Sequence, residues 1–375
     1  MNLASALGRV PKWLLTAGSF LSVAVVWWVD YVTGPELSLF VFYVVPVVVL
    51  VWFVGRAAAR ALSAVAATAW FVADLLTGRE YAHPAIPYWN FAEKLLFFLL
   101  VVELVAVLKR ALEREKLARQ EFFDRELSIA EQVQRRLLPQ APPRLASLEV
   151  AGICRPARGV GGDYYDFLPL DARRLGLAVG DVSGKGLSAA LVMASLQGGL
   201  RSFLSLHGRN LPEVFADANR QLLSLTETTR FATLFFAVYD EDRRELAFVN
   251  AGHNPPMLFR GRDGGAPPER LAPDGPVLGL LPTAAWRSAT TTLAGGDVLV
   301  VFTDGIPEAT NGRDEEFGEA RLARVVAEHR DLPAAELCDV ILREVAAFLD
   351  GVPAGDDQTL LVARSRDVPG ARPAA

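Results

Sequence analysis

The sequence is poor in residues that form covalent crosslinks or bind soft metals. Its 375 residues include two cysteines, Cys154 and Cys338, which lie far apart in the chain. Two isolated cysteines exclude a disulfide framework and a zinc site built from several thiolates. The formal net charge is −5, so the chain lacks the basic field that favours binding to DNA or RNA. We therefore expect no nucleic-acid partner.

Two common phosphate-handling motifs are also missing. A cysteine nucleophile of the thiol phosphatases needs an arginine six positions later, but Cys154 is followed there by Val160. A P-loop around Gly184 and Lys185 would need a glycine at position 179 and Ser or Thr at position 186. The chain has Val179 and Gly186 at these positions. Both mechanisms are therefore excluded.

The apolar residues, 51% of the chain, are concentrated before residue 110. Four stretches there, residues 13–29, 37–54, 58–76 and 91–108, are each about long enough to cross a hydrocarbon core of about 30 Å. They predict a multi-pass region of the cell membrane over residues 1–108. Buried helices of a soluble domain are the alternative, and four such stretches in close succession argue against it.

The charges around these stretches predict their orientation. Lys and Arg stand before the first stretch, between the second and third, and after the fourth, and such residues are retained on the cytoplasmic side. Both termini are therefore predicted to be cytoplasmic. Asp74, Glu93 and Glu103 fall within or near the stretches. Because an ionised side chain in lipid costs free energy, these residues predict pairing between helices or a polar pocket.

Residues 109–138 form the next segment, which contains no Gly or Pro and is dense in charge. Leu108, Phe122 and Ile129 share one position of a seven-residue repeat, with Glu115 at the same position between the first two, so the segment predicts a long amphipathic helix. Prolines at 139, 142 and 143 end it. The helix is either a passive spacer or a lever that transmits a change from the membrane region. We also predict that two copies of the chain pair through this helix to form a homodimer.

Residues 145–365 have the pattern of a soluble domain. Short apolar strands joined by turn residues alternate with pairs of helices, which predicts a layered α+β domain. The tail, residues 366–375, is predicted to be disordered and is assigned no role.

Acidic residues recur beside glycine at the strand ends of this domain. The four places are Gly161-Gly162-Asp163, Gly180-Asp181, Asp304-Gly305 and Gly355-Asp356-Asp357. One such aspartate is usually a turn former. Four at comparable positions suggest carboxylates that converge at one edge of a sheet, where Mg²⁺ or Mn²⁺ prefer oxygen ligands.

Five motifs in this order resemble the SpoIIE and RsbU branch of the metal-dependent protein phosphatase 2C (PPM) family. They are VGGDYYD at 160–166, GDVSGKG at 180–186, NAGHNPP at 250–256, FTDGI at 302–306 and GDDQTLL at 355–361. The segment EQVQRRLLP at 131–139 is similar to the regulatory helix before that domain. The resemblance covers residues 127–363 and leaves the membrane region outside it.

The resemblance implies an α-β-β-α sandwich of two antiparallel sheets covered by helices, here preceded by four transmembrane helices and a helical linker. It also implies that two Mn²⁺ or Mg²⁺ ions are bound by carboxylates. Asp181 would bridge both ions. Asp163 and the Val182 carbonyl would complete one site, and Asp304 and Asp356 would bind the other ion.

Further residues are weaker candidates for the site. Asp357 is a metal ligand or orients its neighbour, and Asp166 is weaker still. Lys185 lies at a predicted helix start, where free amides favour anions, and is either a phosphate contact or a solvated lysine. Arg155 and Arg158 either guide a phosphoprotein or only provide surface charge. His253 is either a general acid or, as we favour, part of a structural corner.

The activity that the resemblance implies is hydrolysis of phosphoserine or phosphothreonine by two-metal activation of water. The implied substrate is a cytoplasmic regulatory protein, such as a phosphorylated anti-sigma-factor antagonist of the STAS type. One alternative is a catalytically silent membrane sensor that uses the same domain to dock a partner. Another is a two-metal phosphatase that acts on small phosphoesters.

Overall fold

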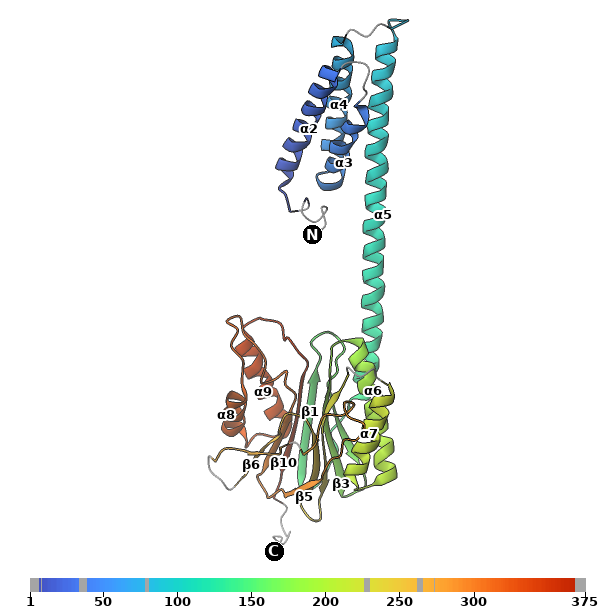
Figure 1. Ribbon diagram of the computed structural model, residues 1–375. Helices are drawn as coiled ribbons and strands as arrows, with labels where there is room; N and C mark the ends of the chain where they lie inside the picture. Colours follow the sequence, from blue (N-terminus) through green and yellow to red (C-terminus); the bar gives the residue numbers. More distant parts are fainter. Residues whose placement is uncertain are drawn as a thin grey trace. The chain divides into compact units, whose positions relative to one another are not determined.

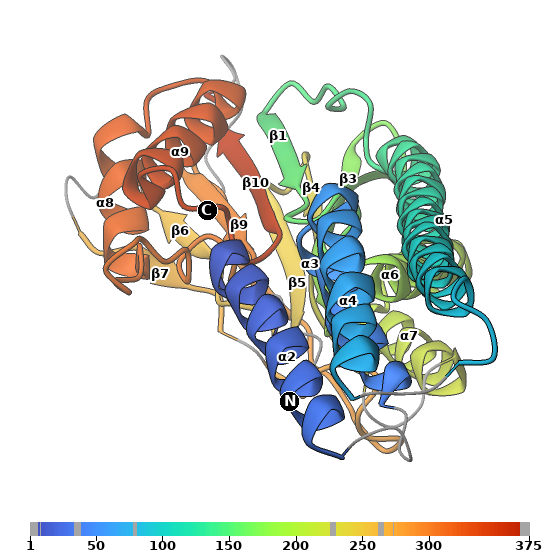
Figure 2. The same ribbon diagram turned by 90° about the horizontal axis from the view of Figure 1, so that it is seen from above.

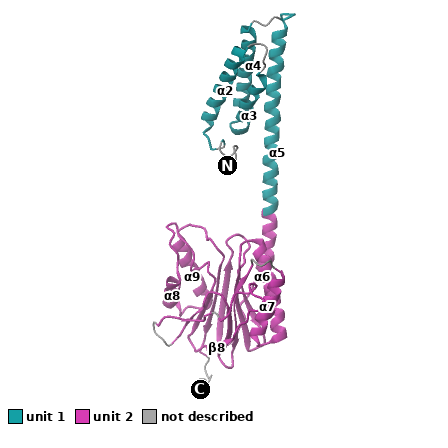
Figure 3. Cartoon of the chain, in the orientation of Figure 1, with its two compact units in different colours: residues 1–123 teal, residues 124–375 magenta. Residues whose placement is uncertain are grey.

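A computed structural model of the chain describes residues 7, 9–33, 39–77, 81–225, 230–261, 266–272 and 274–367. The chain divides into two compact units, residues 1–123 and 124–375 (Figure 3). Helix α5 (Ile86–Leu137) begins in the first unit and ends in the second. It includes nearly all of the predicted helical linker.

The first unit is helical (Figure 1). It consists of α2 (Lys12–Thr33), the 3₁₀ turn η1 (Phe40–Tyr43), α3 (Val44–Phe53), α4 (Arg56–Leu76) and the first part of α5. Its core combines residues from all of these helices, among them Val23, Leu50, Leu62 and Phe98. Many large apolar side chains on its outer surface are exposed, as expected of helices that face lipid.

Two of the four predicted membrane stretches have the length and composition of a span. Among the described residues, three helices are long and apolar enough to cross a membrane: α2, α4 and α6 (Leu187–His207). Helices α2 and α4 match the first and third predicted stretches. Helix α6 lies in the second unit, where its buried residues belong to the core beneath a β-sheet. It is apolar because it covers that sheet.

The other two predicted stretches are not confirmed as spans. In the second, residues 37 and 38 lie outside the described part, and the helical region Phe40–Phe53 is shorter than a span. It ends before Gly55, whose φ of +142° favours glycine. The fourth stretch lies within α5 and contains Glu93, Lys94 and Glu103.

Ionisable side chains in this unit have polar partners, and those of Glu103 lie on another helix, as predicted. Arg60 contacts Glu103 from α4, and Arg56 lies 3.7 Å from the same carboxylate. The hydroxyl of Tyr81 donates to Asp74. Lys94 lies 3.7 Å from Glu93 and packs over the ring of Phe40 and that of Trp70, 4.7 and 5.0 Å from their centroids.

The second unit is a sandwich of two antiparallel five-stranded sheets (Figures 1 and 2). The first sheet has the order β1 (Leu148–Arg155), β10 (Gln358–Ser365), β9 (Val298–Phe302), β6 (Met257–Phe259) and β7 (Glu269–Arg270). The second has the order β2 (Tyr164–Pro169), β3 (Arg174–Val182), β4 (Ala232–Asp240), β5 (Glu245–Ala251) and β8 (Ala289–Thr292).

Helices cover both outer faces of the sandwich. Helices α8 (Glu319–His329) and α9 (Ala334–Leu349) pack on the first sheet, and α6 and α7 (Leu211–Leu225) pack on the second. A third apolar core lies between the sheets and includes Val179, Phe235 and Val301. The central strands are therefore buried on both faces, which explains their nearly continuous apolar sequences. The predicted α-β-β-α layers are confirmed.

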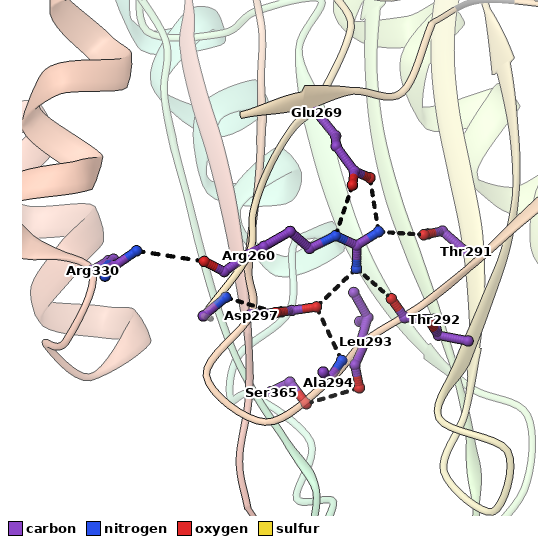
Figure 4. Close-up of polar contacts among 10 residues, drawn as sticks. Arg260, Glu269, Thr291, Thr292, Leu293, Ala294, Asp297, Arg330 and Ser365 are labelled. Carbon is purple, nitrogen blue, oxygen red and sulfur yellow. Dashed lines mark hydrogen bonds and ion pairs between the residues drawn. The ribbon is translucent and has the colours of Figure 1, made fainter. Parts of the chain in front are cut away.

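Arg260 ties the two sheets together at one edge (Figure 4). Its guanidinium donates two hydrogen bonds to Glu269 on β7, at 3.0 and 2.7 Å. It also reaches β8 in the other sheet, where it donates to the Thr291 hydroxyl and the Thr292 carbonyl. A further bond of 2.8 Å goes to Asp297, which is 2% exposed.

Candidate functional site

Four aspartates at strand ends lie at one edge of the sandwich. Asp163 immediately precedes β2, and Asp181 is the penultimate residue of β3. Antiparallel pairing of Tyr164 with Gly180 places these two aspartates side by side. Asp304 follows β9 and Asp356 precedes β10, and these strands are neighbours in the other sheet. The site is therefore built from both sheets.

The pKa values of these carboxyl groups report their proximity. Burial raises the pKa of Asp163 well above its ordinary value, and the charge of Asp181 raises it further. Burial, followed by the charge of Asp304, raises the pKa of Asp181 to about 7. Burial and the charge of Asp356 likewise raise the pKa of Asp304. Carboxylates that disfavour one another's ionisation form a cluster of negative charge that a cation would relieve.

Two threonines hold Asp163 in place from the first sheet. The hydroxyl of Thr303 donates to Asp163 Oδ2 at 2.7 Å. The same hydroxyl accepts the backbone N–H of Thr359 at 3.0 Å. All three residues are buried. Thr303, which directly precedes Asp304, therefore orients Asp163. Thr359, three residues after Asp356, in turn holds the Thr303 hydroxyl.

Asp357 orients the loop before β2. Its Oδ1 accepts the N–H of Ala157 at 2.8 Å, and its Oδ2 accepts the N–H of Gly162 at 2.9 Å. Its own backbone N–H donates to Asp356 Oδ1 at 2.9 Å. Both carboxylate oxygens are thus engaged by the protein. This geometry suits the orienting role that was predicted as one alternative for Asp357.

Glycine is required at this edge because the backbone segments approach closely. A Cβ atom on Gly161 would lie 2.0 Å from Asp357 Oδ2, and one on Gly162 would lie 2.5 Å from the Val182 carbonyl oxygen. A Cβ on Gly305 would lie 1.9 Å from the carbonyl oxygen of Asp357. The glycines beside the acids therefore provide space.

Lys185 belongs to the same cluster. Its Nζ lies 2.7 Å from Asp356 Oδ2 and donates to the Gly355 carbonyl at 2.8 Å. Its charge lowers the pKa of Asp304, against the larger effect of burial. The lysine is exposed at the start of α6. Its predicted contact with a substrate phosphate stays a prediction.

The description of the matching family model is Stage II sporulation protein E (SpoIIE), and the match spans residues 171–366. The chain belongs to this SpoIIE family. Phosphoserine phosphatase RsbU of Bacillus subtilis is 30% identical over 243 residues, which cover 64% of this chain and 70% of RsbU. Protein IcfG of Synechocystis is 29% identical over 265 residues, which cover 63% of this chain and 41% of IcfG. The chain thus matches less than half of IcfG.

Solved structures agree with the SpoIIE assignment. The SiaA-PP2C domain of Pseudomonas aeruginosa has a TM-score of 0.59 and 24% identity, covering 66% of this chain and 98% of that domain. The RsbU and RsbW domains of Rv1364c from Mycobacterium tuberculosis have a TM-score of 0.52 and 30% identity, covering 62% of each chain. The second unit is a domain of the PP2C phosphatase type.

The acidic edge of this SpoIIE-type domain suits hard divalent cations. Its donors are carboxylate oxygens and the Val182 carbonyl, the ligand types that Mg²⁺ and Mn²⁺ prefer. In the described part of the chain, no group of three or more His, Cys, Asp or Glu side chains already has the geometry to hold a metal ion. Phosphatases of the PP2C family are metal-dependent.

Asp166, the weakest predicted ligand, lies away from this edge. It is 1% exposed and accepts three hydrogen bonds from Arg201 on α6, at 2.9 to 3.1 Å. Gln197 and the backbone N–H of Phe167 also donate to it. Its carboxylate is occupied within the protein, so it is not available to a cation at the edge.

The remaining predicted residues lie around the site. Arg155 and Arg158 are exposed, and Arg155 lines a hollow of about 350 Å³ next to the end of α5. His253 is buried, its Nδ1 lies 2.9 Å from the Thr233 hydroxyl, and burial lowers its pKa to about 4. The Asn250 side chain accepts the His253 N–H at 2.8 Å. A neutral, buried histidine in this turn supports the structural interpretation.

Sequence reasoning missed Gln134. This side chain, at the end of α5, is 6% exposed and donates to the Gly161 carbonyl at 2.7 Å. It accepts the Gly161 N–H at 3.2 Å in return. The linker helix is thereby fixed to the loop that carries Asp163. The only sequence signal was a glutamine inside the segment that resembles the family's regulatory helix.

Proposed function

We propose that this protein is a membrane-anchored, metal-dependent phosphatase that hydrolyses phosphoserine or phosphothreonine on a cytoplasmic regulatory protein. The observation that carries the proposal is the cluster of Asp163, Asp181, Asp304 and Asp356 at the edge of a PP2C-type sandwich. Their mutual effect on pKa supports a function for the cluster that depends on cations.

The proposed metal ligands are the four aspartates and the Val182 carbonyl. Two Mn²⁺ or Mg²⁺ ions bound there would supply an activated water and offset charge on the phosphoryl oxygens. Thr303 orients Asp163 and Asp357 orients the glycine loop, and these hydrogen bonds support a role for the protein in positioning the acids.

Three basic residues are proposed to contact the phosphoprotein substrate. Lys185 is exposed beside Asp356 and can turn toward a phosphate by exchanging one anionic partner for another. Arg155 and Arg158 are exposed. Ala157 lies between them in the chain, and its backbone N–H donates to Asp357. A positive rim around an acidic centre favours a phosphorylated protein over a neutral one.

The proposed substrate is a phosphorylated anti-sigma-factor antagonist of the STAS type. Relatives named phosphoserine phosphatase RsbU and RsbP, both of Bacillus subtilis, support this class, because these proteins act in sigma-factor regulation. Two features of the membrane anchor are also proposed: several spans, with both termini on the cytoplasmic side. The length and composition of helices α2 and α4 support the presence of membrane spans.

A homodimer through the linker helix is part of the proposal. Leu108, Phe122 and Ile129 on α5 are 52, 66 and 51% exposed. Apolar residues at sevenfold spacing on an exposed helix are typical of a coiled-coil seam. Crosslinking of a cysteine placed at position 122 would test this pairing in lipid.

The test of activity is manganese-dependent dephosphorylation of candidate phosphoproteins by the full chain in lipid and by a fragment of residues 120–365. We expect turnover that a chelator abolishes and that Asp181→Asn or Asp304→Asn lowers by at least about a thousandfold, as for loss of a central catalytic group. Asp339→Asn, an exposed acid on α9, is the matched control. Normal turnover by folded Asp181→Asn would overturn the proposal.

The alternatives predict different results. A silent docking module would bind the phosphoprotein without releasing phosphate, and the presence of all four core acids argues against it. A small-phosphoester phosphatase would prefer a nucleotide or sugar phosphate to the phosphoprotein. Parallel assays with a phosphopeptide and a nucleotide separate these possibilities.

A further inference from the structure

A cavity of about 490 Å³ lies in the phosphatase domain at the far end of β2 from Asp163. Its wall includes the last residues of β2 and the C-terminal part of α6. Asp163 precedes the first residue of β2, whereas Pro169, the last residue, lines the cavity. The cavity is therefore separate from the acidic edge, and neither the proposed ligands nor Lys185 contributes to it.

The charged side chains that line this cavity are all cationic. They are Arg174, Arg201 and Arg209, whose side chains are 34, 53 and 44% exposed. Among the described residues, no acidic residue lines this cavity. Each arginine has a carboxylate partner that lies outside the lining. The wall thus includes three arginines, each of them paired with a carboxylate outside the lining.

The rest of the wall is largely apolar. Phe167, Leu168, Leu170 and Leu204 line it, together with Pro169. A volume of this order is typical of sites for small organic molecules, which combine apolar walls with a few charged groups. Guanidinium groups suit carboxylates because they can donate two parallel hydrogen bonds.

We propose that this cavity binds a small organic anion, an aromatic or aliphatic body that carries a carboxylate. The apolar wall would bury the body of the ligand, and Arg174 and Arg209 would bind its charged group. These two arginines form ion pairs near the surface, with Asp171 and Asp240, that cost little to rearrange.

Arg201 connects the cavity to the rest of the domain. It holds the buried Asp166, which also accepts a hydrogen bond from Gln197 at 3.2 Å. Gln197 in turn donates to the carbonyl of Leu137, the last residue of α5, at 2.7 Å. A ligand that displaced Arg201 from Asp166 would therefore disturb the hydrogen bonds that link β2, through Gln197, to the end of the linker helix.

The test is ligand-observed fluorine NMR of 6-fluoro-2-naphthoate with the full chain in nanodiscs of uncharged lipid. We expect saturable binding that weakens about tenfold or more in the double variant Arg174→Gln and Arg209→Gln, because two charge-assisted hydrogen-bonding groups are lost. The matched control replaces two exposed arginines on the opposite helical layer, Arg324→Gln and Arg343→Gln, and should bind as the wild type does.

A second variant keeps every arginine. Ser205→Trp places a bulky ring in the cavity wall from an exposed position on α6 and should abolish binding by filling the space. The neutral amide of the same naphthalene should bind at least about tenfold more weakly than the carboxylate. The proposal is overturned if the wild type shows no saturable binding, if the amide binds as tightly, or if both double variants weaken binding equally.

Discussion

Gln134 and Gly161 form two reciprocal hydrogen bonds between the end of the linker helix and the loop before β2. Gly161, the partner of the glutamine, is two residues before Asp163. The neighbouring Gly162 donates to Asp357 at the acidic edge. The contact therefore links the end of α5 to the loop that carries Asp163.

Gln134→Leu should lower both the stability and the activity of the domain. The change leaves the buried N–H and carbonyl of Gly161 without their partners, which costs about 1–3 kcal/mol for each group. Chemical denaturation measures the first effect, and phosphate release under saturating manganese measures the second. Gln132→Leu is the matched control, because Gln132 is exposed on the same helix. Equal losses in both variants would contradict a specific role for Gln134.

Asp181→Asn should stabilise the metal-free protein at neutral pH while it abolishes turnover. Burial raises the pKa of Asp181 from 3.8 to about 7, so the folded state binds a proton that the unfolded state has lost between these values. The stability that this proton confers is present below about pH 4 and is lost as the pH rises through 7. The cost at pH 8 is on the order of 4 kcal/mol.

Thermal unfolding in chelator from pH 4 to pH 8 checks this prediction. The wild type should lose stability over this range more steeply than Asp181→Asn, and the two should converge near pH 4. Manganese should stabilise the wild type and have little effect on the variant. Parallel curves for the two proteins would show that Asp181 ionises freely in the folded state.

Gly161→Ala should inactivate the domain through crowding. Its Cβ would lie 2.0 Å from Asp357 Oδ2, so the loop or the carboxylate must move and the hydrogen bond to Gly162 is strained. The expected result is at least about a hundredfold loss of turnover, as for other displacements of about 1 Å at a catalytic centre. Gly198→Ala is the control, because a Cβ there meets nothing within 4 Å and favours the helix.

Arg260→Leu should destabilise the sandwich without changing the chemistry of the folded enzyme. The change leaves the buried Asp297 without its cation, and loss of one partner of such a pair costs about 3 kcal/mol or more. Arg173→Leu breaks a pair with Asp242 in which both side chains are more than 60% exposed, and should cost less than about 1 kcal/mol. Urea unfolding compares the two, and turnover per folded molecule should match the wild type.

Much of the phosphatase domain could be predicted from the sequence, because its strands and motifs carry local signals. The glycines beside each aspartate marked the places where backbone segments approach, and the four acids do meet at one edge. The fate of Asp166 could not be predicted from the motif. Its partner Arg201 lies 35 residues later on a helix, and a contact of that kind leaves no local pattern.

The membrane region was harder to predict for a different reason. Hydropathy reports how apolar a stretch is, but it does not report where a helix breaks. The 3₁₀ turn at Phe40–Tyr43 and the backbone conformation of Gly55 shorten the second stretch. Conversely, α6 has the composition of a span because it covers a sheet. Gln134 was missed because its partner, Gly161, lies 27 residues away.

The acids come in pairs from two separate sheets, Asp163 and Asp181 from one and Asp304 and Asp356 from the other. Any sliding of one sheet across its neighbour would therefore change the distances between the carboxylates. Divalent ions bound between the two pairs would hold the two sheets together, and the metal occupancy would depend on how well the sheets are aligned.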